Sequence, residues 1–255
     1  YGRLAGEDAA GASAALVTAE AALRSAFEDI RVRGLEQLVK FAAAPSGAAP
    51  AGSPAAGARA AAEELLSEAV EDESAKVRGE AFRTLWAWHE RDPQAVLDRA
   101  RDARFADVRL RAVNELALHG VKADGGWARE RLLALIGDRD AGVAQAALDE
   151  AIKATAKAAG KDEGEAETEA EARKGRAPRD AQAPLAALAS THASVRAAGA
   201  RAAARCEQRA VRDALVKQLS DESEAARTAA LEVLERLLPG ADGHGPLLTA
   251  LQGAH

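Results

Sequence analysis

Apolar positions along the chain recur with the spacing of α-helices, in short segments that come in pairs. In residues 77–88 the apolar and small side chains recur every three or four residues, so they cluster on one side of a helix. A second apolar stretch precedes such helices at residues 62–70, 129–136 and 211–219. No long run of β-branched and aromatic residues alternates with polar ones, as a strand would require. The pattern predicts an all-α fold of helical hairpins.

The second helix of each pair carries an internal repeat. Residues 27–38 align without gaps on residues 105–116, and both segments begin Phe-x-Asp-apolar-Arg-apolar-Arg. The template is an apolar anchor, an arginine directly after it, a small residue at the fourth position after the anchor, and apolar residues at the fifth and eighth. Its anchors are Ile30, Val77, Val108, Val143, Val195 and Ala226. Their separations of 47, 31, 35, 52 and 31 residues predict about six hairpins with two inserts.

Acidic and hydroxyl residues mark the turn inside several hairpins. Asp72, Asp138 and Asp221 each stand five residues before an anchor, and Ser74 and Ser223 follow two of them. Asp and Ser side chains accept hydrogen bonds from the free amides at a helix start. The second helices are therefore predicted to begin at these turns.

Two segments interrupt the helical pattern. Residues 42–57 form an Ala/Pro/Gly/Ser tract with three prolines, which predicts a loop insert. Residues 157–179 are first acidic and then basic, a composition typical of disorder, and they serve either as a solvated spacer or as an interaction segment. We expect residues 1–255 to form one array that continues beyond the chain.

A hairpin with an Asp turn followed by Val-Arg resembles the HEAT repeat, particularly the short bacterial repeats similar to those of phycobilisome lyases. The resemblance covers roughly residues 10–238. It implies an α-solenoid wound as a right-handed superhelix. It says little about function, because HEAT-repeat proteins include scaffolds, transport factors and a few enzymes.

Two columns of the repeat separate a core side from an exposed side. At the fifth position after the anchor every residue is apolar: Leu35, Phe82, Val113, Leu148, Ala200 and Leu231. At the sixth position every residue is polar: Glu36, Arg83, Asn114, Asp149, Arg201 and Glu232. We call this second set the polar column. Together with Trp86 at its edge, it is predicted to line the concave groove and contact a protein partner, although Trp86 also fits core-edge packing.

An arginine column admits two interpretations. It comprises Arg31, Arg78, Arg109, Arg196 and Arg227, and in the degenerate fourth repeat Ala144 replaces the arginine. Such a column could bind phosphate groups. However, its helical angle points into the apolar side, where a guanidinium must be hydrogen-bonded. The turn aspartates of adjacent repeats are natural partners, so we interpret the column as a structural ladder between repeats.

Catalysis would require converging groups, and the sequence offers none. The five histidines have no metal-ligand spacing, and no glycine-rich phosphate loop occurs. The HEAT-type enzyme deoxyhypusine hydroxylase resembles this chain but carries Val-Arg-His-Glu segments, whereas the matching segment here, residues 77–80, reads Val-Arg-Gly-Glu. We therefore expect no enzyme activity, no cofactor and no metal site.

Composition and net charge favour some of the remaining functional classes over others. The resemblance to HEAT-like alkylpurine DNA glycosylases leaves nucleic-acid binding as an alternative, but a net charge of -6 and 3% aromatic residues disfavour it. Chromophore handling, as in phycobilisome lyases, is a second alternative. The chain has no apolar run of membrane-spanning length, and its one cysteine suits a reducing compartment, so we expect a cytoplasmic protein. The favoured function is a non-catalytic protein-interaction scaffold.

Overall fold

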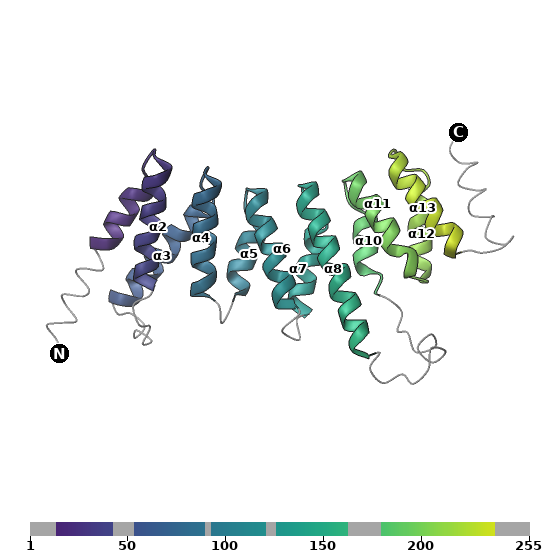
Figure 1. Ribbon diagram of the computed structural model, residues 1–255, viewed down its shortest axis with the longest axis horizontal. Coiled ribbons are helices and arrows are strands. Elements are labelled where there is room, and N and C mark those ends of the chain that lie inside the picture. The colour runs from purple at the N-terminus through teal and green to yellow at the C-terminus, as the bar shows by residue number, and fades with distance from the viewer. Residues whose placement is uncertain (1–13, 43–53, 90–92, 121–125, 163–179, 238–255) are drawn as a thin grey trace. The chain divides into compact units, whose positions relative to one another are not determined.

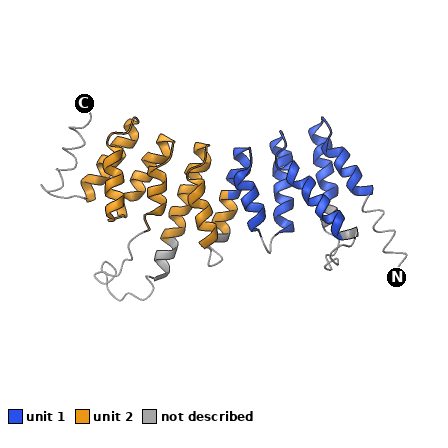
Figure 2. Cartoon of the chain, turned by 180° about the vertical axis from the view of Figure 1, so that it is seen from behind, with its two compact units in different colours: residues 1–112 blue, residues 113–255 orange. Residues whose placement is uncertain are grey.

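A computed structural model describes residues 14–42, 54–89, 93–120, 126–162 and 180–237 (Figure 1), and within these ranges every regular element is a helix. The predicted all-α class is therefore confirmed. The chain divides into two compact units, residues 1–112 and 113–255, with the boundary inside α6 (Figure 2).

Unit 1 consists of consecutive helical hairpins. A helix at residues 14–23 precedes α2 (Glu28–Ala42), and α3 (Pro54–Ala69) pairs with α4 (Ala75–Trp88). The unit ends with α5 (Gln94–Asp102) and the first part of α6 (Ala106–Gly120). Helix α2 packs against both α3 and α4, so neighbouring hairpins share a core.

Unit 2 repeats this arrangement. After the end of α6 come α7 (Gly126–Leu135) and α8 (Ala141–Asp162), then α10 (Gln182–Leu188) and α11 (Ala193–Ala202). The last hairpin is α12 (Arg209–Gln218) with α13 (Glu224–Leu237). Helix α11 packs against α8 on one side and α13 on the other, so the second helices of three hairpins lie side by side.

The predicted turn chemistry is confirmed where second helices begin. The Ser74 hydroxyl caps α4 by accepting from the Val77 amide at 3.4 Å. Asp72 Oδ1 accepts from the Ser74 amide at 2.7 Å, and Asp221 Oδ1 accepts from the Ser223 amide at 2.8 Å. Each aspartate thus satisfies a backbone donor that the helix itself leaves free.

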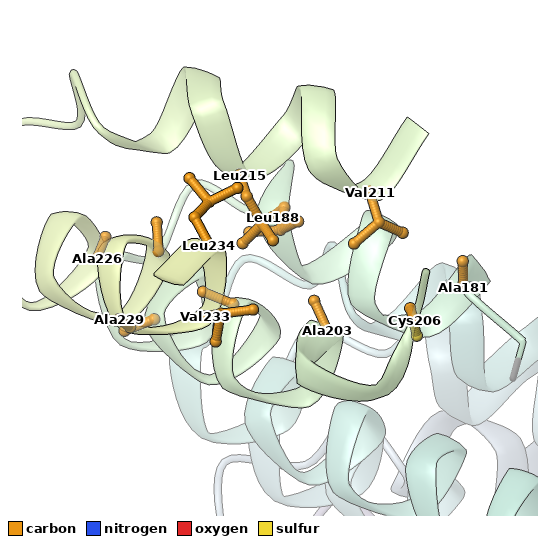
Figure 3. Packing of buried hydrophobic residues seen from close by; sticks show 13 residues of the cluster. Ala181, Leu188, Ala203, Cys206, Val211, Leu215, Ala226, Ala229, Val233 and Leu234 are labelled. Atoms are coloured by element: carbon orange, nitrogen blue, oxygen red, sulfur yellow. The ribbon is translucent and has the colours of Figure 1, made fainter. Parts of the chain in front are cut away.

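Small side chains bring the helices of a hairpin close together. At the fourth position after the anchor stand only glycine and alanine, and a Cβ on Gly199 would lie 2.6 Å from that of Ala187 on α10. Around this contact, buried residues from α10 to α13 form one apolar cluster that includes Leu188, Leu215 and Leu234 (Figure 3).

The helices reach into both predicted inserts. Helix α3 begins at Pro54, inside the 42–57 segment, because proline suits the first turn of a helix, where its missing amide hydrogen has no partner. Helix α8 continues to Asp162, since the Ala- and Lys-rich residues before it favour helix. Residues 54–57 and 157–162 of the predicted inserts are therefore helical, and the remaining residues 43–53 and 163–179 lie outside the described ranges.

Candidate functional site

Each ladder arginine donates hydrogen bonds to the turn of its own hairpin. Arg78 Nη1 donates to the carbonyl oxygens of Asp72 and Glu73, at 2.8 and 3.0 Å. These carbonyls stand six and five residues before the arginine, at the junction of α3 and α4. The same pair of positions accepts from the four other ladder arginines, with distances between 2.7 and 3.2 Å. The guanidinium therefore replaces water for turn carbonyls that have no helical partner.

A second edge of the guanidinium reaches the next hairpin. Arg196 Nε and Nη2 donate to Asp221 Oδ2 and Oδ1 at 2.6 and 2.8 Å, a bidentate pair between α11 and the α12–α13 turn. Arg31 Nη2 donates to Asp72 Oδ1 at 3.0 Å, and its Nε lies 2.8 Å from Oδ2 without hydrogen-bond alignment. These contacts have the geometry of a ladder between repeats.

The Arg196–Asp221 pair is shielded from water. The side chains of Arg196 and Asp221 are 11% and 7% exposed. The hydrogen bonds from Arg196 lower the pKa of the Asp221 carboxyl below its ordinary value of 3.8, more than burial raises it. The same bonds raise the pKa of the Arg196 guanidinium. Both groups stay charged at neutral pH.

Arg78 uses a different carboxylate. At the turn position where an aspartate was expected stands Ala103, and Arg78 instead pairs with Asp107 in the first turn of α6, with Nε 3.1 Å from both carboxylate oxygens. Its guanidinium also stacks on the Phe105 ring, 3.9 Å from the centroid. A carboxylate four residues later in the sequence thus takes the same role.

His192 compensates for the missing arginine of the fourth repeat. Its Nε2 lies 2.9 Å from the Asp138 carbonyl oxygen, six residues before Ala144. That oxygen is the one that an arginine at position 144 would contact. His192 stands three residues before its anchor Val195, the position that Phe105 occupies before Val108. This role of His192 was not predicted, although Ala144 in place of the arginine marked the position in the sequence.

The structure leaves the polar column on the surface of each unit. Arg83 in unit 1 is exposed and pairs with Glu80 on its own helix. Trp86 is half-buried and stacks on Phe82, with 6.1 Å between ring centroids. In unit 2 the exposed members of the column are Asn114, Asp149, Arg201 and Glu232.

An acidic groove in unit 1 was not predicted. A cavity of about 830 Å³ opens between α3 and α5, lined by Ala60, Glu63, Glu64, Ser67, Glu68, Glu71 and Arg99. Two of these carboxylates already have partners, since Glu63 contacts His89 Nε2 at 3.0 Å and Glu71 accepts from the Arg104 amide. The glutamates at intervals of four and five residues on α3 were the available signal.

The described residues contain neither a metal-binding cluster nor a membrane-spanning helix. No group of three or more His, Cys, Asp or Glu side chains in these ranges could hold a metal ion. None of the described helices is long and apolar enough to cross a bilayer.

Comparisons with known proteins add little. No family model and no curated protein matches the chain. A crystal structure described as that of an engineered protein is similar over 87% of this chain and 96% of that chain, with 20% sequence identity and a TM-score of 0.30. A similarity this weak has no bearing on fold or function.

Proposed function

We propose that the chain is a non-catalytic protein-binding scaffold, an α-solenoid of HEAT-like hairpins wound as a right-handed superhelix, and that the polar column contacts its partner. The strongest support is that the arginine column is hydrogen-bonded within the fold, whereas the polar column is exposed. The ladder arginines are engaged with turn carbonyls, so their Nη1 atoms are not available to a ligand. The polar column, five residues further along each second helix, is exposed instead.

In unit 2 the column offers a surface of alternating charge. Asp149, Arg201 and Glu232 lie on α8, α11 and α13, which pack side by side (Figure 1). Charges of alternating sign select partners by complementarity and by repulsion of wrong ones. A protein segment with a complementary sequence of charges is the ligand that fits this surface.

In unit 1 Trp86 supplies a different contact. An aromatic ring that is half-buried on Phe82 is held in one orientation while part of its surface stays open. Fixed aromatic rings of this kind are common energetic centres of protein interfaces. Unit 1 is therefore proposed to bind through an apolar anchor beside Arg83, and unit 2 through charge.

The mixed sign of the polar column also bears on the alternatives. Binding of nucleic acid by phosphate contacts requires a predominantly basic surface. Two of the three unit 2 residues named above are acidic, which favours protein over nucleic acid or an anionic chromophore. A cytoplasmic location belongs to the same proposal, because a single cysteine forms no disulfide within the chain and so suits a reducing compartment.

Charge reversal with a matched control tests the proposal. The variant Asp149→Arg/Arg201→Glu/Glu232→Arg should lose partners that the wild-type chain captures from a native lysate. The control Glu207→Arg/Arg209→Glu/Asp213→Arg makes the same exchanges at exposed positions on and just before α12 and should retain them. Equal capture by all three proteins would contradict the proposed surface. Salt-sensitive capture of nucleic acid alone would favour the nucleic-acid alternative.

A further inference from the structure

Two exposed arginines stand about one helical turn apart at the end of α11. Arg201 lies in the last turn of α11, and Arg205 ends the short 3-10 helix η2 (Ala203–Arg205) that follows it. Neither guanidinium forms an ion pair, a hydrogen bond or a ring contact with any residue that the structure describes. We call Arg201 and Arg205 the α11 arginine pair.

The two guanidinium groups of this pair repel each other. Like charges at positions i and i+4 of a helical segment lie close together and disfavour the helix. The partial negative charge at the C-terminal end of α11 offsets some of this repulsion. An anion that accepts hydrogen bonds from both groups would remove the rest, because charge-assisted hydrogen bonds to arginine are strong.

The neighbouring second helices of unit 2 leave the pair without a counter-charge. Helix α11 packs against both α8 and α13 (Figure 1). On α8, Asp149 accepts from Gln145 at 2.9 Å and Glu150 pairs with Lys153 at 2.6 Å, so these charges are engaged within their own helix. On α13, Glu232 is exposed and forms no ion pair with any described residue.

Arg196 on the same helix shows which ligand satisfies such a group. Within the fold, its guanidinium binds both oxygens of the Asp221 carboxylate. The α11 arginine pair offers the same donors to solvent, so a carboxylate from another molecule is the complementary ligand. A long polyanion fits less well, because Asp149 and Glu232 on the two neighbouring helices repel negative charge on either side of the pair.

We propose that the α11 arginine pair binds an acidic side chain of the protein partner, on a segment whose flanking basic residues face Asp149 and Glu232. This inference rests on the proposed function of the polar column and adds Arg205 to that surface. Axes of packed helices lie about 8–10 Å apart, which an extended segment spans in about three residues. The segment that crosses from α8 to α13 therefore carries charges in the order basic, acidic, basic, one at every third residue.

A nuclear magnetic resonance titration of the full chain at low ionic strength tests this inference with two peptides. The first, Lys-Gly-Ser-Glu-Gly-Ser-Lys, has the proposed order of charges, and the second exchanges lysine and glutamate. The first peptide should shift the amide resonances of Arg201 and Arg205 and should bind more tightly than the second. Arg201→Gln/Arg205→Gln should weaken binding of the first peptide roughly tenfold and keep the wild-type circular dichroism spectrum. The control Arg209→Gln/Lys217→Gln removes the same charge from exposed positions of α12 and should bind like the wild type.

Several results would overturn the role of the arginine pair. These are equal binding of the two peptides, binding that survives Arg201→Gln/Arg205→Gln, and tighter binding of an oligothymidylate of similar length, which would favour nucleic acid. If the charge-reversed polar column loses its lysate partners while the two peptides bind equally, the arginine pair is excluded and the polar column retained. Selective peptide binding with unchanged lysate capture would instead contradict the proposed function and keep the arginine pair as a carboxylate site.

Discussion

His192 Nε2 lies 2.9 Å from the carbonyl oxygen of Asp138, and so occupies the place of the arginine that the fourth hairpin lacks. In each described hairpin that carries a ladder arginine, the carbonyl oxygen six residues before that arginine accepts a hydrogen bond from its guanidinium. Within unit 2, a histidine of the later hairpin therefore supplies a hydrogen bond to the turn that precedes α8.

Removal of this histidine should weaken unit 2 locally. His192→Ala leaves the Asp138 carbonyl without the bond, and we expect the free energy of unfolding to fall by about 0.5–1.5 kcal/mol. Hydrogen exchange should show faster opening of α8 and α11, with the exchange of α3 and α4 unchanged. Thr191→Ala at the exposed neighbouring position is the control and should leave exchange as it is. Equal exchange in wild type and His192→Ala would show that the contact contributes nothing.

Alanine substitutions of two arginines on α4 test whether the arginine column is structural and the polar column is exposed. Arg78→Ala removes bonds to two turn carbonyls and to Asp107 from a side chain that is 8% exposed, and should cost about 1–3 kcal/mol of stability. Arg83→Ala removes a contact with Glu80 from a side chain that is 72% exposed, and should cost less than about 0.5 kcal/mol. Denaturant unfolding followed by circular dichroism measures both. Similar losses would mean that the two columns have been assigned to the wrong sides.

Alanine substitutions at two glycines should change the stability in opposite directions, because only one of the two glycines is tightly packed. Gly199→Ala places a Cβ 2.6 Å from that of Ala187, so α10 and α11 must separate, at a cost of about 1–3 kcal/mol. Gly57→Ala in α3 meets nothing within 4 Å and should stabilise by about 0.5–1 kcal/mol through helix propensity. Thermal unfolding of the two variants should therefore shift in opposite directions. A gain in stability for Gly199→Ala would show that the hairpin is loosely packed.

Acid should remove part of the stability of unit 2. The pKa of Asp221 is lowered in the folded state, so its contribution is complete above the unfolded value of about 4 and is lost as pH falls through the lower folded value. The stability difference between the wild type and Asp221→Asn should be constant between about pH 7 and pH 5 and narrow at lower pH. Urea unfolding of both proteins at several pH values measures this stability difference. A difference that widens in acid would have the wrong sign for this pair.

The sequence was sufficient for the parts of the fold that are set within one hairpin. Helical periodicity placed the second helices, and Ser74 and Asp72 marked the start of α4, because a cap acts on amides a few residues away. Pro54 was misassigned to a loop because proline both ends helices and opens them, and only the neighbouring hairpin decides between the two.

Contacts between hairpins were harder to predict. The carboxylates that meet Arg31, Arg78 and Arg196 stand 41, 29 and 25 residues further along the chain. The helical angle of the arginine column indicated that these arginines need hydrogen-bond partners. However, the pairing of Arg78 with Asp107, in place of a turn aspartate, depends on how α4 and α6 approach each other. Likewise, the prediction that Leu231 belongs to the core was wrong, since its side chain is 39% exposed. The exposure of Leu231 depends on which surfaces adjoin α13, and its own apolar character carries no information on this.

A double-mutant cycle on Arg196 and Asp221 tests most directly the claim that the arginine column joins adjacent hairpins and leaves the polar column free for a partner. Urea unfolding of the wild type, Arg196→Ala, Asp221→Ala and the double variant gives the coupling energy between the two side chains. A buried bidentate pair at 2.6 and 2.8 Å predicts a favourable coupling of about 1–3 kcal/mol. Additive effects, with a coupling below about 0.5 kcal/mol, would contradict the ladder and return the arginines to the set of candidate ligand-binding residues.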